Sequence, residues 1–314
     1  MPPPAAPQPA VRIPFAKPAL TFTQQIAKLQ GEGMVIADPA LAQHCLQHIS
    51  YYRLSAYWLY FEHPKGQAGP RFRPGTTFED VVALYEFDRA LRLLVLDAVE
   101  RIEVAVRGSW AYQLATKNGP HGYLRAGLYS DKGKLSAKKR ELTAQVNRSK
   151  DTFIIHYKAK YSGPKHPPVW MASELMSFGL LSSLYGLLKE PKDRNAIAAP
   201  FGLDEVVFGP AVQNISTVRN ICAHHGRLWN QRMKATLKLP KKQPPELANA
   251  LNRAANDRLY NTLAFVKYLL DRCDPANTWG QRLIAHMATL APGREADMGC
   301  PPDWRDYKLW GGQK

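Results

Sequence analysis

Apolar residues recur at intervals of three and four along most of the chain, the spacing that one face of an α-helix produces. The longest such pattern predicts a helix from Thr77 to about Thr116, capped by Thr77 with Asp80 three residues later. Its apolar stripe consists of Leu84, Phe87, Leu91, Leu94, Ala98, Ile102 and Ala105. Its other faces carry three i,i+4 pairs of opposite charge, Asp88/Arg92, Asp97/Arg101 and Glu103/Arg107. We expect this helix to bury one side against a bundle, with either a kink near Gly108 or an extension toward a second copy.

Shorter helices are predicted on both sides of the long one. Before it, Thr23 is expected to cap a helix ending at Leu29, Asp38 and Pro39 begin a second, and a third spans about 52–61. After it, the helices expected are 132–150, one from Val169 with a break at Gly179, one from Asp204 to about Gly226, 246–272 and 277–290. The sequence contains no run of alternating strands and no glycine-rich phosphate loop. The fold class is therefore mainly α.

Proline content suggests the domain organisation. Residues 1–19 contain seven prolines and little that could be buried, so we expect an extended or disordered arm without a catalytic role. A second segment rich in proline and glycine, 63–74, predicts a loop or short hairpin. The prediction is an N-terminal helical cap region over 20–74 and a larger helical domain over 75–314, with a basic insertion at 130–168.

The chain is strongly basic, with 42 Lys and Arg residues against 26 Asp and Glu and a formal net charge of +16. Such an excess favours a polyanionic partner such as nucleic acid, or an anionic membrane surface. Between 132 and 150 there is a single acid, and we expect the basic side chains there to bind RNA: Lys134, Lys138, Lys139, Arg140, Arg148 and Lys150. Tyr157, Tyr161 and Trp170 follow, as a surface that stacks single-stranded bases requires. The competing interpretation is a solvated basic helix and core aromatics.

A second aromatic group surrounds Arg53 and consists of Tyr51, Tyr52, Tyr57 and Trp58. One interpretation is an RNA-stacking cluster in which Arg53 binds RNA. The other, more common in proteins, is core packing with Arg53 in a salt bridge.

The four cysteines, Cys45, Cys222, Cys273 and Cys300, form no CxxC pair, which fits free thiols in a reducing cytoplasm. The sequence has neither a membrane-spanning run nor the apolar core of a signal peptide, so we expect a soluble cytoplasmic protein with no membrane partner. Cys222 and His225 have the spacing of half a zinc site, but no further ligands are evident nearby. We therefore predict no metal and no cofactor.

The strongest candidate for chemistry is the stretch Arg219 to His225, RNICAHH. On a helix, Asn220 and His224 lie one turn apart on the same face, and Arg219 is beside Asn220. Arginine binds phosphate oxygens as a planar, permanently charged fork, and a histidine that titrates near neutrality can transfer a proton. Arg219, Asn220 and His224 can therefore converge on a phosphodiester.

These residues lie within RNICAHHGRLWN (Arg219 to Asn230), which resembles the R-x4-H signature of HEPN ribonucleases in the variant of the Abi-like (AbiD/AbiF-type) abortive-infection proteins. Four more blocks resemble that group: ISYYRLSAYW from Ile49, FEDVVALYEFDRALRLL from Phe78, AVERIEVAVR from Ala98 and MGCPPDWRDYKLW from Met298. The R-x4-H pattern alone is weak, but five blocks in order are fairly specific. They cover nearly the whole chain after about residue 19. Cys300 stands where the group often has a larger apolar residue, a departure that touches packing.

The resemblance implies a HEPN-type helical bundle with additional N-terminal and C-terminal helices. It also implies a phage-defence toxin that cleaves RNA, and frequently an antitoxin, which for this group is proposed to be a small noncoding RNA. The family's catalytic arginine, polar neighbour and histidine correspond to Arg219, Asn220 and His224. The acid on a preceding helix that often supports such sites corresponds to Glu100 or Glu103.

The expected mechanism needs no metal. Arg219 would stabilise charge on the phosphorane oxygens, His224 would transfer a proton, and Asn220 would hold the imidazole or the phosphate. Because each chain has one motif, we predict a homodimer that brings two sets into one cleft. His225 in place of His224, or a structural motif, are the alternatives at the site. A non-catalytic RNA-binding module is the alternative function, and a helical adaptor for a protein partner is a third.

Overall fold

The computed structural model describes residues 14–314, and these residues are mainly helical. They form thirteen α-helices joined by loops and short 3-10 turns, and their β-structure consists of three isolated bridges. The prediction of a mainly α fold is confirmed. The predicted arm at 1–19 falls largely outside the described residues, and residues 14–19 form no helix.

The chain divides into two compact units, one ending at Tyr85 and the other comprising Glu86–Lys314. The first unit contains α1 (Phe22–Gly31), α2 (Pro39–His48) and α3 (Tyr51–Trp58). Asp38 caps α2 as expected, with Oδ1 accepting from the Ala40 amide at 2.9 Å. The cap of α1 is Thr21 rather than Thr23, because Thr21 and Gln24 form a reciprocal capping box.

The core of the first unit contains the aromatic group that surrounds Arg53. Tyr57 and Trp58 are buried, whereas Tyr52 is exposed. The Tyr51 and Trp58 rings meet edge to face with centroids 4.8 Å apart. The burial of Tyr57 and Trp58 agrees with the core-packing interpretation, whereas Tyr52 is open to solvent and Tyr51 and Arg53 are half-buried.

The long helix α4 (Phe78–Asn118) begins in the first unit and continues into the second. Thr77 and Asp80 cap it reciprocally, with the Asp80 amide 3.0 Å from Thr77 Oγ1. All three expected i,i+4 ion pairs are present, at Asp88/Arg92, Asp97/Arg101 and Glu103/Arg107. The helix is continuous through Gly108, where a kink was one of the two alternatives considered.

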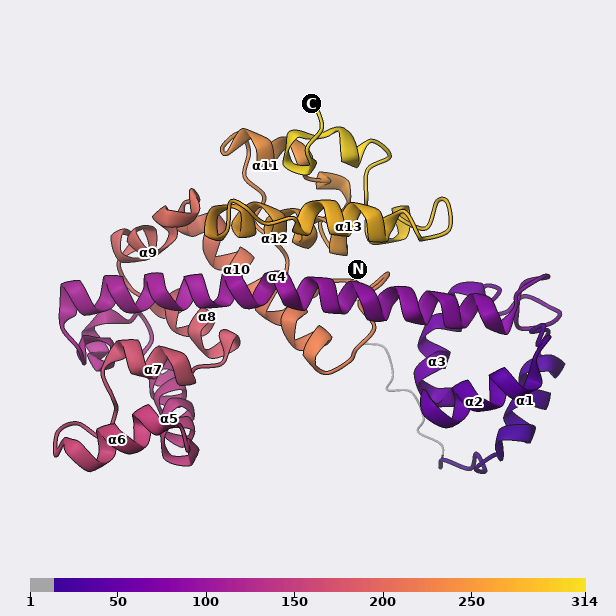
Figure 1. Ribbon diagram of the computed structural model, residues 1–314, viewed down its shortest axis with the longest axis horizontal. Coiled ribbons are helices and arrows are strands. Elements are labelled where there is room, and N and C mark those ends of the chain that lie inside the picture. Colours follow the sequence, from indigo (N-terminus) through magenta and orange to yellow (C-terminus); the bar gives the residue numbers. More distant parts are fainter. Residues whose placement is uncertain (1–13) are drawn as a thin grey trace, which may run out of the picture. The chain divides into compact units, whose positions relative to one another are not determined.

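The second unit adds nine helices after α4, shown in Figure 1. They are α5 (Lys132–Arg148), α6 (Thr152–Lys160), α7 (Val169–Leu175), α8 (Phe178–Leu187), α9 (Pro191–Ala198), α10 (Glu205–Ala223), α11 (Pro245–Ala250), α12 (Leu259–Cys273) and α13 (Trp279–Met287).

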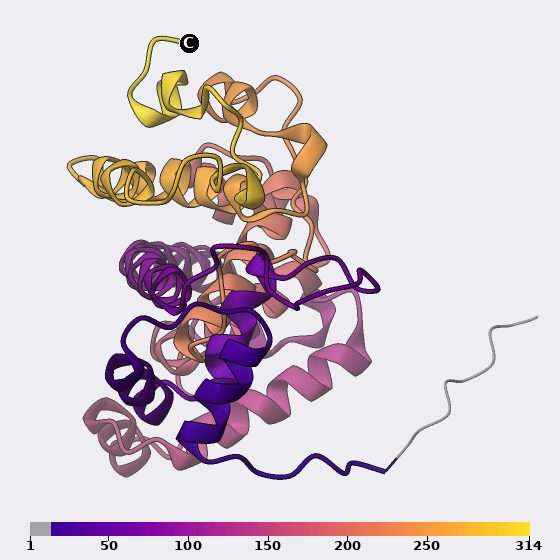
Figure 2. The same ribbon diagram turned by 90° about the vertical axis from the view of Figure 1, so that its right-hand side faces the viewer.

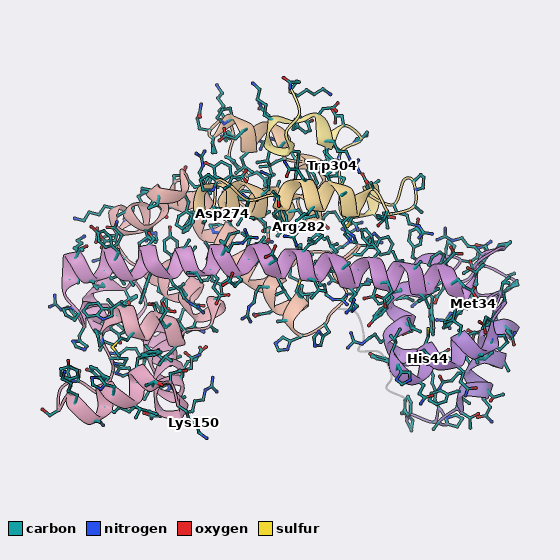
Figure 3. The ribbon with its side chains drawn as sticks, in the orientation of Figure 1. Met34, His44, Lys150, Asp274, Arg282 and Trp304 are labelled. Carbon is teal, nitrogen blue, oxygen red and sulfur yellow. The ribbon has the colours of Figure 1, made fainter. Side chains whose placement is uncertain are left out.

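Within the second unit, α12 and α13 run alongside α4 (Figures 1 and 2). Trp279 Nε1 donates to the Leu94 carbonyl at 2.7 Å. At the surface, Arg101 of α4 pairs with Asp274 at 2.7 Å, and Asp97 pairs with Arg282 at 2.7 Å. Figure 3 labels Asp274 and Arg282 on the side of these elements that faces α4.

Two expected helix boundaries are wrong, and in both places a polar side chain hydrogen-bonds the backbone near the actual boundary. The single helix predicted for 246–272 is divided into α11 and α12, because the Asn261 side chain bonds the backbone amide and carbonyl of Asn252, each at 2.8 Å. The break expected at Gly179 lies before it, where Ser177 caps α8 through the Leu180 amide at 3.2 Å. Gly179 is inside α8.

Candidate functional site

The predicted site residues lie at the C-terminal end of α10. Asp204 caps the start of this helix by accepting from the Val207 amide at 2.9 Å. Its apolar face, including Phe208, Ile215 and Val218, is fully buried in the second unit. This packing fixes the direction in which the end of the helix presents Arg219 and the residues that follow.

Arg219 is held beside a buried acid of α4. Its Nε lies 3.6 Å from Glu103 Oε2, and the Glu103 side chain is only 7% exposed whereas that of Arg219 is 38% exposed. Glu103 also pairs with Arg107, whose Nη2 donates to the Met176 carbonyl at 2.8 Å. The structure thus brings Glu103, one of two predicted supporting acids, to the predicted arginine.

A hollow of about 350 Å³, here called the Arg219 pocket, lies at this ion pair. Leu96, Glu100, Glu103, Val104, Arg107 and Arg219 line it. Glu100 is therefore near the arginine as well, but it is exposed and belongs to the rim. The half-exposed guanidinium of Arg219 can bind a phosphate in this pocket while its ion pair with Glu103 restricts its motion.

Asn220 and His224 are also exposed at this end of α10. Asn220 Oδ1 accepts a hydrogen bond from Arg219 Nη1 at 3.4 Å. The His224 amide donates to the Asn220 carbonyl at 3.0 Å, the i to i−4 bond that sets the two residues one turn apart. Helix α10 ends at Ala223, so His224 is its C-terminal capping residue rather than an internal one.

His225 has a left-handed backbone, with a φ of 58°. Its amide donates to the Cys222 carbonyl at 3.0 Å and the Gly226 amide to the Ile221 carbonyl at 2.8 Å, which together form a Schellman motif. Glycine is the usual residue at this position, and a side chain there costs free energy. Such an outlier is a reason to suspect a functional role for His225 too.

Sequence reasoning missed the role of Asp88, which it placed only in an ion pair with Arg92. The carboxylate is fully buried and accepts from the backbone amides of Leu228 (3.1 Å) and Trp229 (2.6 Å), directly after the two histidines. Asp88 thereby ties the turn that carries His224 and His225 to α4. No sequence pattern links residues 140 positions apart, so this contact had no signal in the sequence.

Cys222 is buried beneath the same turn. Burial, with a smaller contribution from the negative charge of Asp88, raises the pKa of its thiol to about 12. A thiol that stays protonated at neutral pH is a poor nucleophile and a poor metal ligand. His225 by contrast is exposed, and the described residues contain no group of three or more side chains that could hold a metal ion.

The predicted RNA-binding residues of α5 have different surroundings. Lys139 Nζ donates to the Leu124 carbonyl and Arg140 Nη1 to Ser136 Oγ, each at 3.1 Å. Arg148 and Lys150 are exposed at the C-terminal end of α5, where Figure 3 labels Lys150. Lys134 and Lys138 differ from all of these, because they line a hollow of about 1080 Å³ together with Asn220. Arg53 belongs to α3 of the first unit.

Comparison with known proteins gives one match. A family model described as Abi-like protein matches residues 44–230, which include α3 and the whole segment from Arg219 to Asn230. No curated protein and no solved structure matches the chain. Among the described residues, no helix combines the length and the apolar character that crossing a membrane requires.

Proposed function

The chain belongs to the Abi-like protein family, and from that membership we propose that it is a metal-independent endoribonuclease of the HEPN type. The family match supports a role in abortive infection, a form of phage defence. The observation that carries the proposed activity is the placement of Arg219 beside buried Glu103 and next to Asn220, which lies one helical turn from His224.

The proposed chemistry is an internal transfer within RNA. The 2′-oxygen loses its proton and attacks the adjacent phosphorus, while the bond to the 5′-oxygen of the next nucleotide breaks and that oxygen gains a proton. His224 takes part in these proton transfers, and Arg219 neutralises charge on the non-bridging oxygens. Asn220 orients the imidazole or the phosphate. The products are a 2′,3′-cyclic phosphate and a 5′-hydroxyl.

Glu103 supports this role because it holds the Arg219 side chain in place while part of the guanidinium stays free to bind phosphate. A buried carboxylate shared by two guanidiniums restricts both of them, which lowers the entropy lost when phosphate binds. The exposed side of the Arg219 guanidinium stays open to solvent. We therefore assign Glu103 as the positioning acid and leave Glu100 as a rim residue of the Arg219 pocket.

A homodimer would supply a second set of proton-transfer groups. Two apolar side chains of α4, Leu93 and Val104, are 55% and 53% exposed, and Val104 lines the Arg219 pocket. An exposed apolar surface beside a candidate site favours an interface there. We propose that a two-fold axis near this face joins two Arg219 pockets.

Control by a noncoding RNA antitoxin follows from the resemblance of the chain to AbiF-type proteins and from its formal charge of +16. A single observation favours the alternative of a non-catalytic RNA-binding module: Arg219 already pairs with Glu103, as a structural arginine would. Binding that depends on salt is expected from both functions, so only cleavage separates them.

The test compares His224→Ala with His44→Ala, which removes an exposed histidine of α2 in the first unit (labelled in Figure 3). Each purified protein is incubated with labelled single-stranded RNA, and binding and cleavage are measured separately. We expect His224→Ala to retain binding and to lose at least about a hundredfold in rate, the typical contribution of a general acid or base. Equal cleavage by both variants would contradict the role of His224.

A further inference from the structure

A groove with a volume of about 1080 Å³ runs along one face of α10 in the second unit. We call it the α8–α10 groove. Its α10 wall is formed by residues spaced three or four apart: Glu205, Val206, Gly209, Pro210, Gln213, Ser216, Thr217 and Asn220. Because this face ends at Asn220, the groove runs along the helix to the residue next to Arg219.

The α5 wall contributes lysines to the groove. Lys134 and Lys138 line it, and the Lys134 ammonium group is well exposed, 3.7 Å from Asp131. Lys138 lies 3.1 Å from Glu141 in a half-exposed pair of the kind that contributes little in water. A phosphate can therefore replace these carboxylates as a partner at small cost. Lys132 of α5 and Lys192 of α9, by contrast, are exposed but do not line the groove.

The floor of the groove carries small polar residues of α8 and α10. Ser183 and Thr217 donate their hydroxyl hydrogens to helix carbonyls at 2.8 and 3.0 Å, which leaves their oxygens as acceptors. Ser182 also lines the groove and is only 8% exposed. A polar ligand in the groove can exchange hydrogen bonds with these hydroxyl groups.

We propose that the α8–α10 groove binds the single-stranded segment of RNA that leads to the cleavage site. Phosphates contact Lys134 and Lys138, sugar hydroxyls and base edges contact the hydroxyl floor, and the chain passes Asn220 to reach Arg219. A single strand is required because short side chains reach base edges only where the bases are unpaired. The proposal rests on the proposed function, since it takes RNA as the substrate.

The first test measures the salt dependence of RNA binding. Lys134→Gln with Lys138→Gln is compared with Lys132→Gln and Lys192→Gln, so that both double variants lower the formal net charge from +16 to +14. Each phosphate contact on a single strand contributes about 0.7 to the slope of log K against log salt. We expect the groove pair to reduce the slope by about 1.4. The control pair should leave it nearly unchanged.

The second test blocks the groove without disturbing the core. An ideal Cβ on Gly186, a helical residue that lines the groove, meets no atom within 4 Å. The same holds for Gly108 of α4, which lies elsewhere. We expect Gly186→Leu to weaken binding of labelled single-stranded RNA by about tenfold, and Gly108→Leu to leave it within about twofold.

Equal effects of groove and control variants would overturn the proposal, because they would show a general effect of charge or size. So would unchanged RNA affinity in both groove variants, the result expected if the groove accommodates a protein partner. Failure of the wild type to bind any RNA would instead reject the proposed function. If the wild type cleaves RNA and neither groove variant changes RNA binding, the proposed ribonuclease function stands but RNA binding in the α8–α10 groove is rejected.

Discussion

Replacement of Asp88 tests how the histidine turn is held in place. Removing one partner of a buried ion pair costs about 3–5 kcal/mol, because the other charge stays buried without compensation. Asp88→Ala removes the buried carboxylate that pairs with Arg92 and accepts from the amides of Leu228 and Trp229. We expect a loss of about 3–5 kcal/mol for Asp88→Ala. For Asp88→Asn, which keeps one oxygen for the amides, we expect about 2 kcal/mol.

The assay is urea unfolding, read as a shift in the midpoint at constant slope. Asp274→Ala is the matched control, because Asp274 pairs with Arg101 of the same helix at the surface, and its loss should cost at most about 1 kcal/mol. Hydrogen exchange should report faster exchange of the Leu228 and Trp229 amides in both Asp88 variants. A cost for Asp88→Ala similar to that of the control, with unchanged exchange, would refute the reasoning.

Three further outcomes follow. His225→Gly should raise the unfolding free energy by up to about 1 kcal/mol, because glycine removes the strain of the left-handed backbone. The gain is limited because glycine loses more chain entropy on folding. A thermal melt that shows a loss of stability of that size would contradict the strain. Between pH 9 and 11 the wild type should lose more stability than Cys222→Ala, because the folded thiol, with a pKa of about 12, stays protonated after the unfolded thiol has ionised near its ordinary pKa of 9.0. Urea midpoints that change in parallel with pH for the two proteins would contradict this. Val104→Asp should be a monomer by light scattering and should cleave RNA more slowly, whereas Ile155→Asp, which changes a similarly exposed residue of α6, should do neither. A fully active monomer would contradict the proposed dimer.

Local patterns in the sequence were sufficient for most of the helices. The caps at Asp38 and Thr77 and the ion pairs of α4 depend on residues three or four apart, and these predictions hold. The division of 246–272 depends on a side chain of the second half bonding the backbone of the first, which apolar spacing does not encode. The same holds for the site. The motif from Arg219 to His224 is local and could be predicted, whereas the hydrogen bonds of Asp88 to the histidine turn and the groove beside α5 join segments distant in the sequence.

The central claim is metal-independent cleavage, and the most direct measurement is the end chemistry of RNA fragments made in EDTA. Purified wild-type protein, freed of bound nucleic acid, is incubated with labelled single-stranded RNA, and the fragments are resolved beside markers of known termini. The account predicts fragments ending in 2′,3′-cyclic phosphate and 5′-hydroxyl, and none with Arg219→Ala. Cleavage that requires a divalent metal or leaves a 5′-phosphate would contradict it, as would RNA that stays bound and intact.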